Sequence, residues 1–474
     1  MADRGNELPR GRVRRTMPLA GFTARAAGGA MVAALREKAG DQGAVARFHE
    51  KTADRYSELL GHSKGVLMKA GQLMSMMELG PPGEGEASPY QAALSRLQAD
   101  APPMDAALAR SVLERDLGCS TEQIFAEFTA EPMAAASIGQ VHRAVLHDGR
   151  QVAVKIQYPS AAEAIRHDLA NTELLATVLR FVTSASGNAI QADLRQASRE
   201  VAARISEEVD YRHEAQNITK FARLYDGHPF IRIPDVVAEA SADRVLTMTY
   251  IDGVNWSAAL EADQDLKNTW AEAITRFSTG SFRHANLFHA DPHPGNYRFR
   301  PDGTIGIVDF GCVKVIPETL RLDFVKMIRA AMEERKDDVR DLLDQMGFFQ
   351  GDSTPTADEI YTYFAGPLVE QLTGTQPMTF TADAPQTAMR AFMDVRSREH
   401  PVRRMSIPDD LVFLTRVNLS MTAVLGKLGA TLHNRAILDD MDGTAEPLTP
   451  LGEAHIAWVR DRGLPFGLQV HEHH

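Results

Sequence analysis

A loop that carries two prolines and a glycine between acidic and amide side chains constrains the fold of this chain more than any other feature. Residues 289–296 read HADPHPGN, and DFG follows at residues 309–311. Because proline lacks a backbone N–H group, segment 289–296 is predicted to be a loop rather than a helix. Residues 304–308 are predicted to form a short strand after a Pro-Asp-Gly turn. This strand is expected to bring Asp309 beside Asp291 and Asn296.

These three polar side chains have the chemistry that phosphoryl transfer requires. Mg²⁺ prefers carboxylate and amide oxygens together with phosphates, and a further carboxylate orients the attacking hydroxyl. We therefore predict that Asn296 and Asp309 bind magnesium and that Asp291 is catalytic. A helix cap and an ordinary turn are the alternative, but D-x-x-x-x-N followed by DFG favours catalysis. The alternation of His289, Asp291 and His293 also fits a transition-metal cluster, which is the weaker interpretation.

Lys155 lies in an apolar run, residues 152–156, that is predicted to be a buried strand. The turn sequence at 147–150 makes this strand the antiparallel neighbour of residues 140–146. A buried lysine is costly unless it meets an anion, and nucleotide phosphates supply one. On its own, such a lysine is more often an edge-strand surface residue. We predict that Lys155 is catalytic and binds the nucleotide, held by a carboxylate of the next long helix. The candidates are Glu208, Asp210 and Glu214.

An alanine-rich segment precedes this hairpin where kinases carry a glycine-rich loop over the phosphates. It consists of Ala134, Ala135, Ala136 and Ser137. Alanine reaches positive φ less readily than glycine, so this loop is predicted to hold phosphates in a different way. Taken alone, the segment would be interpreted as one that packs a helix tightly against a strand.

Composition excludes several classes of protein. The chain has 474 residues, 44% of them hydrophobic, which is enough for a sizeable core. A net charge of −12 argues against a bulk-basic nucleic-acid binder. Cys119 and Cys312 form no C-x-x-C pattern, which fits a reducing compartment. Because no run of eighteen apolar residues occurs, we predict no membrane-spanning helix.

The pattern of elements predicts an α+β fold with two lobes and a cleft between them. Residues 1–40, which are rich in arginine and poor in acids, form a basic arm. A transit peptide, a membrane-surface segment and a disordered tail are all compatible with this arm. The expected domains are a helical extension at 41–104, an N-terminal lobe at 105–252 and a mostly helical C-terminal lobe at 253–474. The N-terminal lobe includes expected strands at 230–237 and 244–251.

Taken together, these motifs resemble the UbiB/ADCK/AarF family of atypical kinases over roughly residues 55–345. The matching features share the family's order along the chain. They are the K-x-G-Q motif of Lys69 and Gln72, the alanine-rich loop with Gln140, Lys155, the E-x-D pair Glu208 and Asp210, then Glu214 and Asn217, the 289–296 loop and Asp309-Phe310-Gly311.

The resemblance implies a protein-kinase-like fold with ATP and Mg²⁺ as cofactors. It implies that Glu214 is the partner of Lys155. It further implies that the extension folds over the active site, where Lys69 and Gln72 would meet the E-x-D residues and exclude a protein substrate. Such proteins resemble ATPases or small-molecule kinases linked to isoprenoid-quinone lipid biosynthesis, including that of ubiquinone.

The adenine hinge is expected near residues 248–251, where Met248 and Ile251 would contact the nucleotide. The alternative is an ordinary core strand, because both interpretations bury Met248. Only residues 312–316 separate Gly311 from Pro317, which we expect at the first position of a helix. This spacing leaves no room for a peptide-docking activation segment with its A-P-E motif.

The predicted function is therefore an ATP- and Mg²⁺-dependent kinase or ATPase acting on a small molecule or lipid. The expected location is cytoplasmic, with peripheral membrane contact through the basic arm. A non-catalytic, nucleotide-gated scaffold or lipid-binding chaperone is the first alternative. A kinase for a soluble alcohol is the second, although the K-x-G-Q and E-x-D signatures speak against it. The acceptor and the oligomeric state are not predicted.

Overall fold

The computed structural model describes residues 104–136, 138–159, 210–349, 354–382, 405 and 408–470, with a few positions between 36 and 52. These residues form two compact units. The first contains the described residues up to Glu214 together with Val236–Tyr250. The second contains Ala215–Asp235 and the described residues from Ile251 onward. Ser137, Lys69, Gln72, Glu208 and most of the predicted extension lie outside the described residues.

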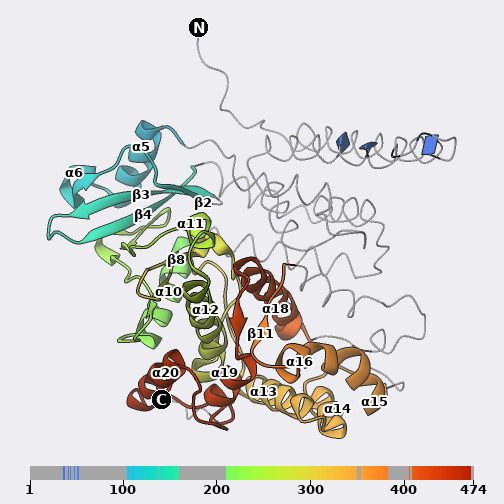
Figure 1. Ribbon diagram of the computed structural model, residues 1–474. Coiled ribbons are helices and arrows are strands. Elements are labelled where there is room, and N and C mark those ends of the chain that lie inside the picture. The colour runs from blue at the N-terminus through green and yellow to red at the C-terminus, as the bar shows by residue number, and fades with distance from the viewer. Residues whose placement is uncertain are drawn as a thin grey trace. The chain divides into compact units, whose positions relative to one another are not determined.

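The first unit is built on an antiparallel sheet with strand order β1-β3-β4-β6. Strands β2, β3 and β4 of this sheet are labelled in Figure 1. Its strands are β1 (Phe125–Phe128), β2 (Ala134–Ala136), β3 (Gly139–Leu146), β4 (Gln151–Gln157) and β6 (Val245–Thr249). Strand β2 pairs with the beginning of β3, and β1 pairs with its end. The predicted hairpin is confirmed, because β3 and β4 are antiparallel neighbours joined by a turn with Gly149 at φ 87°.

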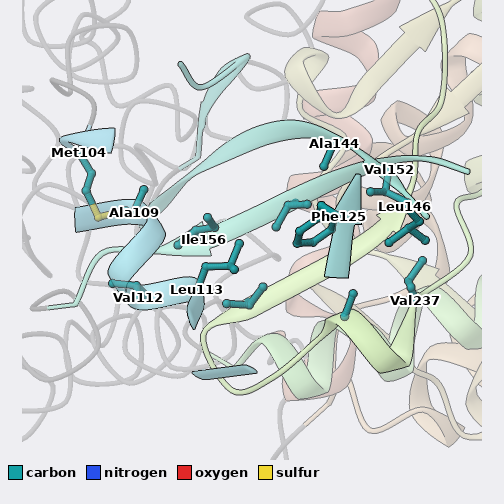
Figure 2. Close-up of a cluster of buried hydrophobic side chains, with 13 residues drawn as sticks. Met104, Ala109, Val112, Leu113, Phe125, Ala144, Leu146, Val152, Ile156 and Val237 are labelled. Carbon is teal, nitrogen blue, oxygen red and sulfur yellow. The ribbon is translucent and has the colours of Figure 1, made fainter. Parts of the chain in front are cut away.

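Alternation along β4 gives this sheet two different faces. Val152, Val154 and Ile156 point to one face and belong to the apolar core (Figure 2). Helix α5 (Ala106–Leu117) contributes buried side chains to the same core. Asp105 caps this helix by accepting hydrogen bonds from the first-turn amides. The opposite face carries Ala153 and Lys155.

Close approach of β3 and β4 explains a glycine in the alanine-rich region. A Cβ atom at Gly139 would lie 2.2 Å from the carbonyl oxygen of Ile156. The prediction that residues 134–137 form a loop is wrong for Ala134–Ala136, which pair with β3 as strand β2. In this extended conformation, alanine needs no positive φ. Glycine is required at position 139 by space rather than by backbone conformation.

The second unit is mostly helical, and the predicted α+β class is confirmed. Helix α12 (Gln264–Ala285) contacts several other helices of this unit (Figure 1). They are α13 (Glu318–Met332), α18 (Asp409–Leu428), α19 (Asn434–Asp442) and α20 (Pro450–Asp461). The remaining α-helices of the unit are α11 (Trp256–Leu260), α14 (Lys336–Gln345), α15 (Ala357–Ile360) and α16 (Gly366–Thr373), together with the part of α10 (Tyr211–Leu224) that follows Glu214. A π-helical turn, Tyr361–Ala365, joins α15 to α16.

Three small sheets complete this unit. Strands β5 (Ile231–Arg232), β9 (Ile305–Ile307) and β8 (Tyr297–Phe299) form one, in that order. Strands β10 (Val313–Val315) and β7 (Leu287–His289) form the second. Strands β11 (Met378–Thr379) and β12 (Thr431–Leu432) form the third.

Several predicted boundaries are corrected by proline chemistry. The strand expected at 230–237 is reduced to β5 and an isolated bridge at Val236, because Pro234 cannot donate to a ladder. Within segment 289–296, residues 294–296 form one 3₁₀ turn, since Pro294 stands at a position whose N–H would be unpaired anyway. Pro317 is the N-cap rather than the first helical residue, and α13 begins at Glu318.

Within the part of the chain that the structure describes, no helix is both long enough and apolar enough to cross a bilayer.

Candidate functional site

The first group of predicted site residues lies in the second unit, on the loop that follows β7. Asn296 donates from Nδ2 to the backbone oxygen of Asp291 at 3.0 Å and to its Oδ2 at 3.1 Å. Burial and then the charge of Asp291 raise the pKa of Tyr297, the residue after Asn296. The Asn296 amide thus holds the Asp291 carboxylate through its nitrogen, and its oxygen is an acceptor that can serve as a ligand.

A second loop brings Asp309 to the same place. Strand β9 precedes Asp309 and pairs with β8, which begins directly after Asn296. Strand β10 follows the DFG turn and pairs with β7, so that Val313 lies opposite His289. His289 Nε2 also donates to the backbone oxygen of Asp309 at 2.8 Å. Pairing on both sides fastens the turn of Asp309 to the loop of Asp291 and Asn296.

The turn itself has a defined conformation. Asp309 Oδ1 accepts a hydrogen bond from the backbone N–H of Gly311 at 3.1 Å. The carbonyl oxygen of Phe310 accepts one from Asn217 Nδ2, also at 3.1 Å. The Phe310 ring is fully buried against Phe221, with ring centroids 4.9 Å apart. The bond from Asn217 was not foreseen in the sequence, where this residue appeared only as part of a family pattern.

The second group lies in the first unit. Lys155 Nζ lies 2.8 Å from each carboxylate oxygen of Glu214. The lysine is 7% exposed and the glutamate 1% exposed, so the pair is shielded from water. The structure thus contains the ion pair that the family pattern suggested. Tyr211, one turn before Glu214 on α10, places its ring 5.2 Å from the ammonium group, a cation–π contact that sequence reasoning missed.

The remaining predicted contacts are placed as follows. Met248 is buried within β6, opposite Ala153. Ile251 follows the strand, and its Cγ2 atom is 2.4 Å from the position that a Cβ on Gly306 would take. Asp210, predicted to meet Lys69 and Gln72, starts α10 by accepting from the backbone N–H of His213 at 3.0 Å. The encounter with the extension stays a prediction.

The transition-metal interpretation of the two histidines is not supported. His289 is buried and uses Nε2 to hold the Asp309 carbonyl. His293 Nδ1 accepts from the backbone N–H of Gly295. Among the residues that the structure describes, no cluster of three or more His, Cys, Asp or Glu side chains is suited to a metal ion. An Asn–Asp pair that relies on phosphate oxygens for its remaining ligands would fit Mg²⁺ instead.

A kinase-like domain accounts for this arrangement of loops and strands. The ABC1 atypical kinase-like domain matches residues 96–343, just over half of the chain. The chain therefore belongs to the ABC1 family of atypical kinases, the UbiB/ADCK/AarF group, and has its kinase-like fold.

Individual relatives are moderately similar. AarF domain-containing protein kinase 1 of Xenopus laevis is 31% identical over 327 residues, which are 67% of this chain and 59% of that protein. The mitochondrial atypical kinase COQ8B of Danio rerio is 30% identical over 284 residues, covering 60% of this chain and 44% of that protein. The chain thus matches about half of these curated relatives' length.

A solved structure is similar over most of both chains. It is the complex of Rv3197 with erythromycin, from Mycobacterium tuberculosis. The sequences are 33% identical, the TM-score is 0.60, and the match covers 85% of this chain and 98% of that one.

Proposed function

We propose that this protein is an ATP- and Mg²⁺-dependent kinase or ATPase that acts on a small molecule or lipid. One observation carries the proposal. The pairing of β7 with β10 and the bond from His289 to Asp309 fasten the loop of Asp291 and Asn296 to the turn of Asp309. Oxygen donors fixed in this way match what a magnesium–nucleotide complex requires.

Each residue has a distinct role in this proposal. Asp291 orients the acceptor hydroxyl, and Asn296 holds the Asp291 carboxylate while offering its own amide oxygen to the metal. Asp309 is the second metal ligand. Bound Mg²⁺ would neutralise charge on the phosphates. Lys155, positioned by Glu214, binds the α- and β-phosphates.

Two observations support a non-protein acceptor. Strand β10 and the start of α13 at Glu318 follow directly after Gly311 and leave only a few residues between them. A docking segment for a peptide would have to fit between them. In addition, the similar Mycobacterium tuberculosis protein was solved with erythromycin, a small molecule. We include a link to isoprenoid-quinone lipids in the proposal, on the strength of the family resemblance.

Calorimetric titration with ATP tests the metal site. Wild-type protein is expected to bind ATP more tightly with Mg²⁺ than without it. Asp309→Asn should lose most of this difference, because it removes a charged ligand. Asp302→Asn is the matched control, since Asp302 is an exposed turn residue between β8 and β9. Equal magnesium dependence in Asp309→Asn and wild type would remove Asp309 from the site.

Slow ATP turnover tests the catalytic role. Asp291→Asn should abolish it while leaving ATP binding intact. Turnover that persists in this variant would exclude Asp291 as the orienting group. Tight binding without hydrolysis, even with lipid or quinone precursors present, would favour the non-catalytic scaffold or lipid chaperone. A soluble phosphorylated product would favour a soluble-alcohol kinase.

Peripheral membrane contact through the basic arm is a separate part of the proposal. Arginines without nearby acids are attracted to anionic lipid surfaces. Flotation with anionic liposomes is expected for the full chain and not for a chain lacking residues 1–40. Equal flotation of both would exclude the arm as the contact.

A further inference from the structure

Two successive carbonyl oxygens of the DFG turn accept hydrogen bonds from buried side chains that belong to two different elements. His289 of β7 binds the carbonyl oxygen of Asp309, and Asn217 of α10 binds that of Phe310. Asn217 is 1% exposed. Because successive peptide groups are held from separate elements, the turn cannot rotate without breaking at least one of these bonds.

Helix α10 also holds the side chain of the same phenylalanine. Phe221 stands one turn after Asn217, and its ring packs against Phe310. The helix therefore contacts both the main chain and the ring of this one residue. If Phe310 turned away, the Asn217 amide would be left buried without its partner, and buried unpaired amides are costly and rare.

We propose that Asn217 is a positioning residue for the metal site. Its bond to Phe310 holds the turn in the conformation in which the Asp309 carboxylate faces the metal. The inference rests on the proposed role of Asp309 as a magnesium ligand. In this role Asn217 acts through the carbonyl oxygen of Phe310 and is not itself a ligand of the metal.

Substitution of Asn217 by a residue of similar size without a donor tests the proposal. Asn217→Leu is compared with Thr219→Val, which removes a hydrogen bond internal to the same helix, from Thr219 Oγ1 to the Ala215 carbonyl. The gain in ATP affinity that Mg²⁺ provides is expected to fall roughly tenfold in Asn217→Leu, the equivalent of one lost buried hydrogen bond. Affinity without Mg²⁺ should be unchanged, and Thr219→Val should resemble wild type.

A second variant covers the case in which leucine prevents folding. Asn217→Asp keeps the side-chain shape but places an acceptor against the Phe310 carbonyl, so the same or a larger loss is expected. Full retention of the magnesium-dependent gain in the folded variants would overturn the proposal. If wild type itself shows no magnesium dependence, the proposed function fails instead.

Hydrogen exchange separates these two failures, because it needs no nucleotide. The Gly311 amide, bonded to Asp309 Oδ1, should exchange about tenfold faster in Asn217→Leu and at the wild-type rate in Thr219→Val. Unchanged exchange at Gly311 would overturn the positioning role whatever the protein binds.

Discussion

A chain of three buried histidines makes the stability of the second unit dependent on pH. The backbone N–H of Ile231 donates to His228 Nδ1 at 3.1 Å, so the proton of a neutral His228 ring is on Nε2. That nitrogen lies 3.0 Å from His455 Nδ1, and His455 Nε2 lies 3.2 Å from His284 Nε2. At the other end of this series of hydrogen bonds, His284 Nδ1 donates to the carbonyl oxygen of Pro465 at 2.7 Å. Backbone groups at both ends select one set of neutral tautomers.

Adding a proton to this chain would place two donors face to face. Burial first, and then the charges of Arg232, His284 and Arg276, lower the pKa of His228 to about 2. Burial first, and then the charges of His284, His228 and Arg276, lower the pKa of His455 well below its usual value. In the unfolded chain both rings have a pKa near 6.5. Below that pH the unfolded state therefore binds protons that the folded state does not bind.

The sign and size of the effect follow directly. The stability that the neutral histidines contribute is fully present above about pH 6.5, and this contribution is lost as the pH falls below that value. Between pH 7.5 and 5.5, proton binding to each histidine raises the population of the unfolded state relative to the folded state by a factor of about ten. This lowers the free energy of unfolding by about 1.4 kcal/mol per histidine. Two histidines together are expected to cost about 2.7 kcal/mol, a large part of a typical unfolding free energy of about 5–15 kcal/mol.

Urea unfolding followed by tryptophan fluorescence measures this loss. All three tryptophans of the chain, Trp256, Trp270 and Trp458, lie in the second unit, so the signal reports on that unit. His228→Asn can still accept from the Ile231 N–H but cannot titrate. It should be less stable at pH 7.5, yet lose at least about 1.4 kcal/mol less than wild type on acidification to pH 5.5.

A surface histidine provides the control. His147 is exposed in the first unit, and His147→Asn should leave the acid sensitivity of the tryptophan signal unchanged. Equal losses of stability in wild type and His228→Asn would refute the reasoning, because they would show that the buried chain takes up no protons on unfolding.

Two further predictions concern the first unit. Lys155→Met removes the ammonium group that lies 2.8 Å from both oxygens of the buried Glu214 carboxylate, and it should cost about 3–5 kcal/mol of stability, measured by urea denaturation with circular dichroism. The double variant with Glu214→Leu should recover part of that loss, and a double variant no more stable than the single one would contradict this. Gly139→Ala forces a Cβ against the Ile156 carbonyl and should cost about 1–3 kcal/mol, whereas Gly149→Asn, in an open turn, should cost less than about 1 kcal/mol. Similar melting temperatures for these two glycine variants would show that the close contact of residue 139 with the Ile156 carbonyl does not destabilise the Ala variant.

Local features of this chain were determined by the sequence itself. The alternation of residues 151–157 and the turn at 147–150 specify the β3–β4 hairpin, because both depend on neighbouring residues alone. Asp105 specifies the start of α5 in the same way. The loop of Asp291 and Asn296 was also recognisable, since its prolines exclude a long helix. These motifs sufficed to identify the family and its α+β fold.

Tertiary structure alone decided which of these features meet. Glu214, rather than Asp210, pairs with Lys155 across 59 positions, and Asn217 reaches Phe310 across 93. Ala134–Ala136 became a strand because β3 offered an unpaired edge there. Partners so distant in the chain are selected by packing and by the need to pair every buried polar group. Nearest-neighbour patterns carry no information about either requirement. The family resemblance suggested the pair of Lys155 and Glu214, whereas the bond from Asn217 to Phe310 and the pairing of β2 with β3 could be learned only from the folded chain.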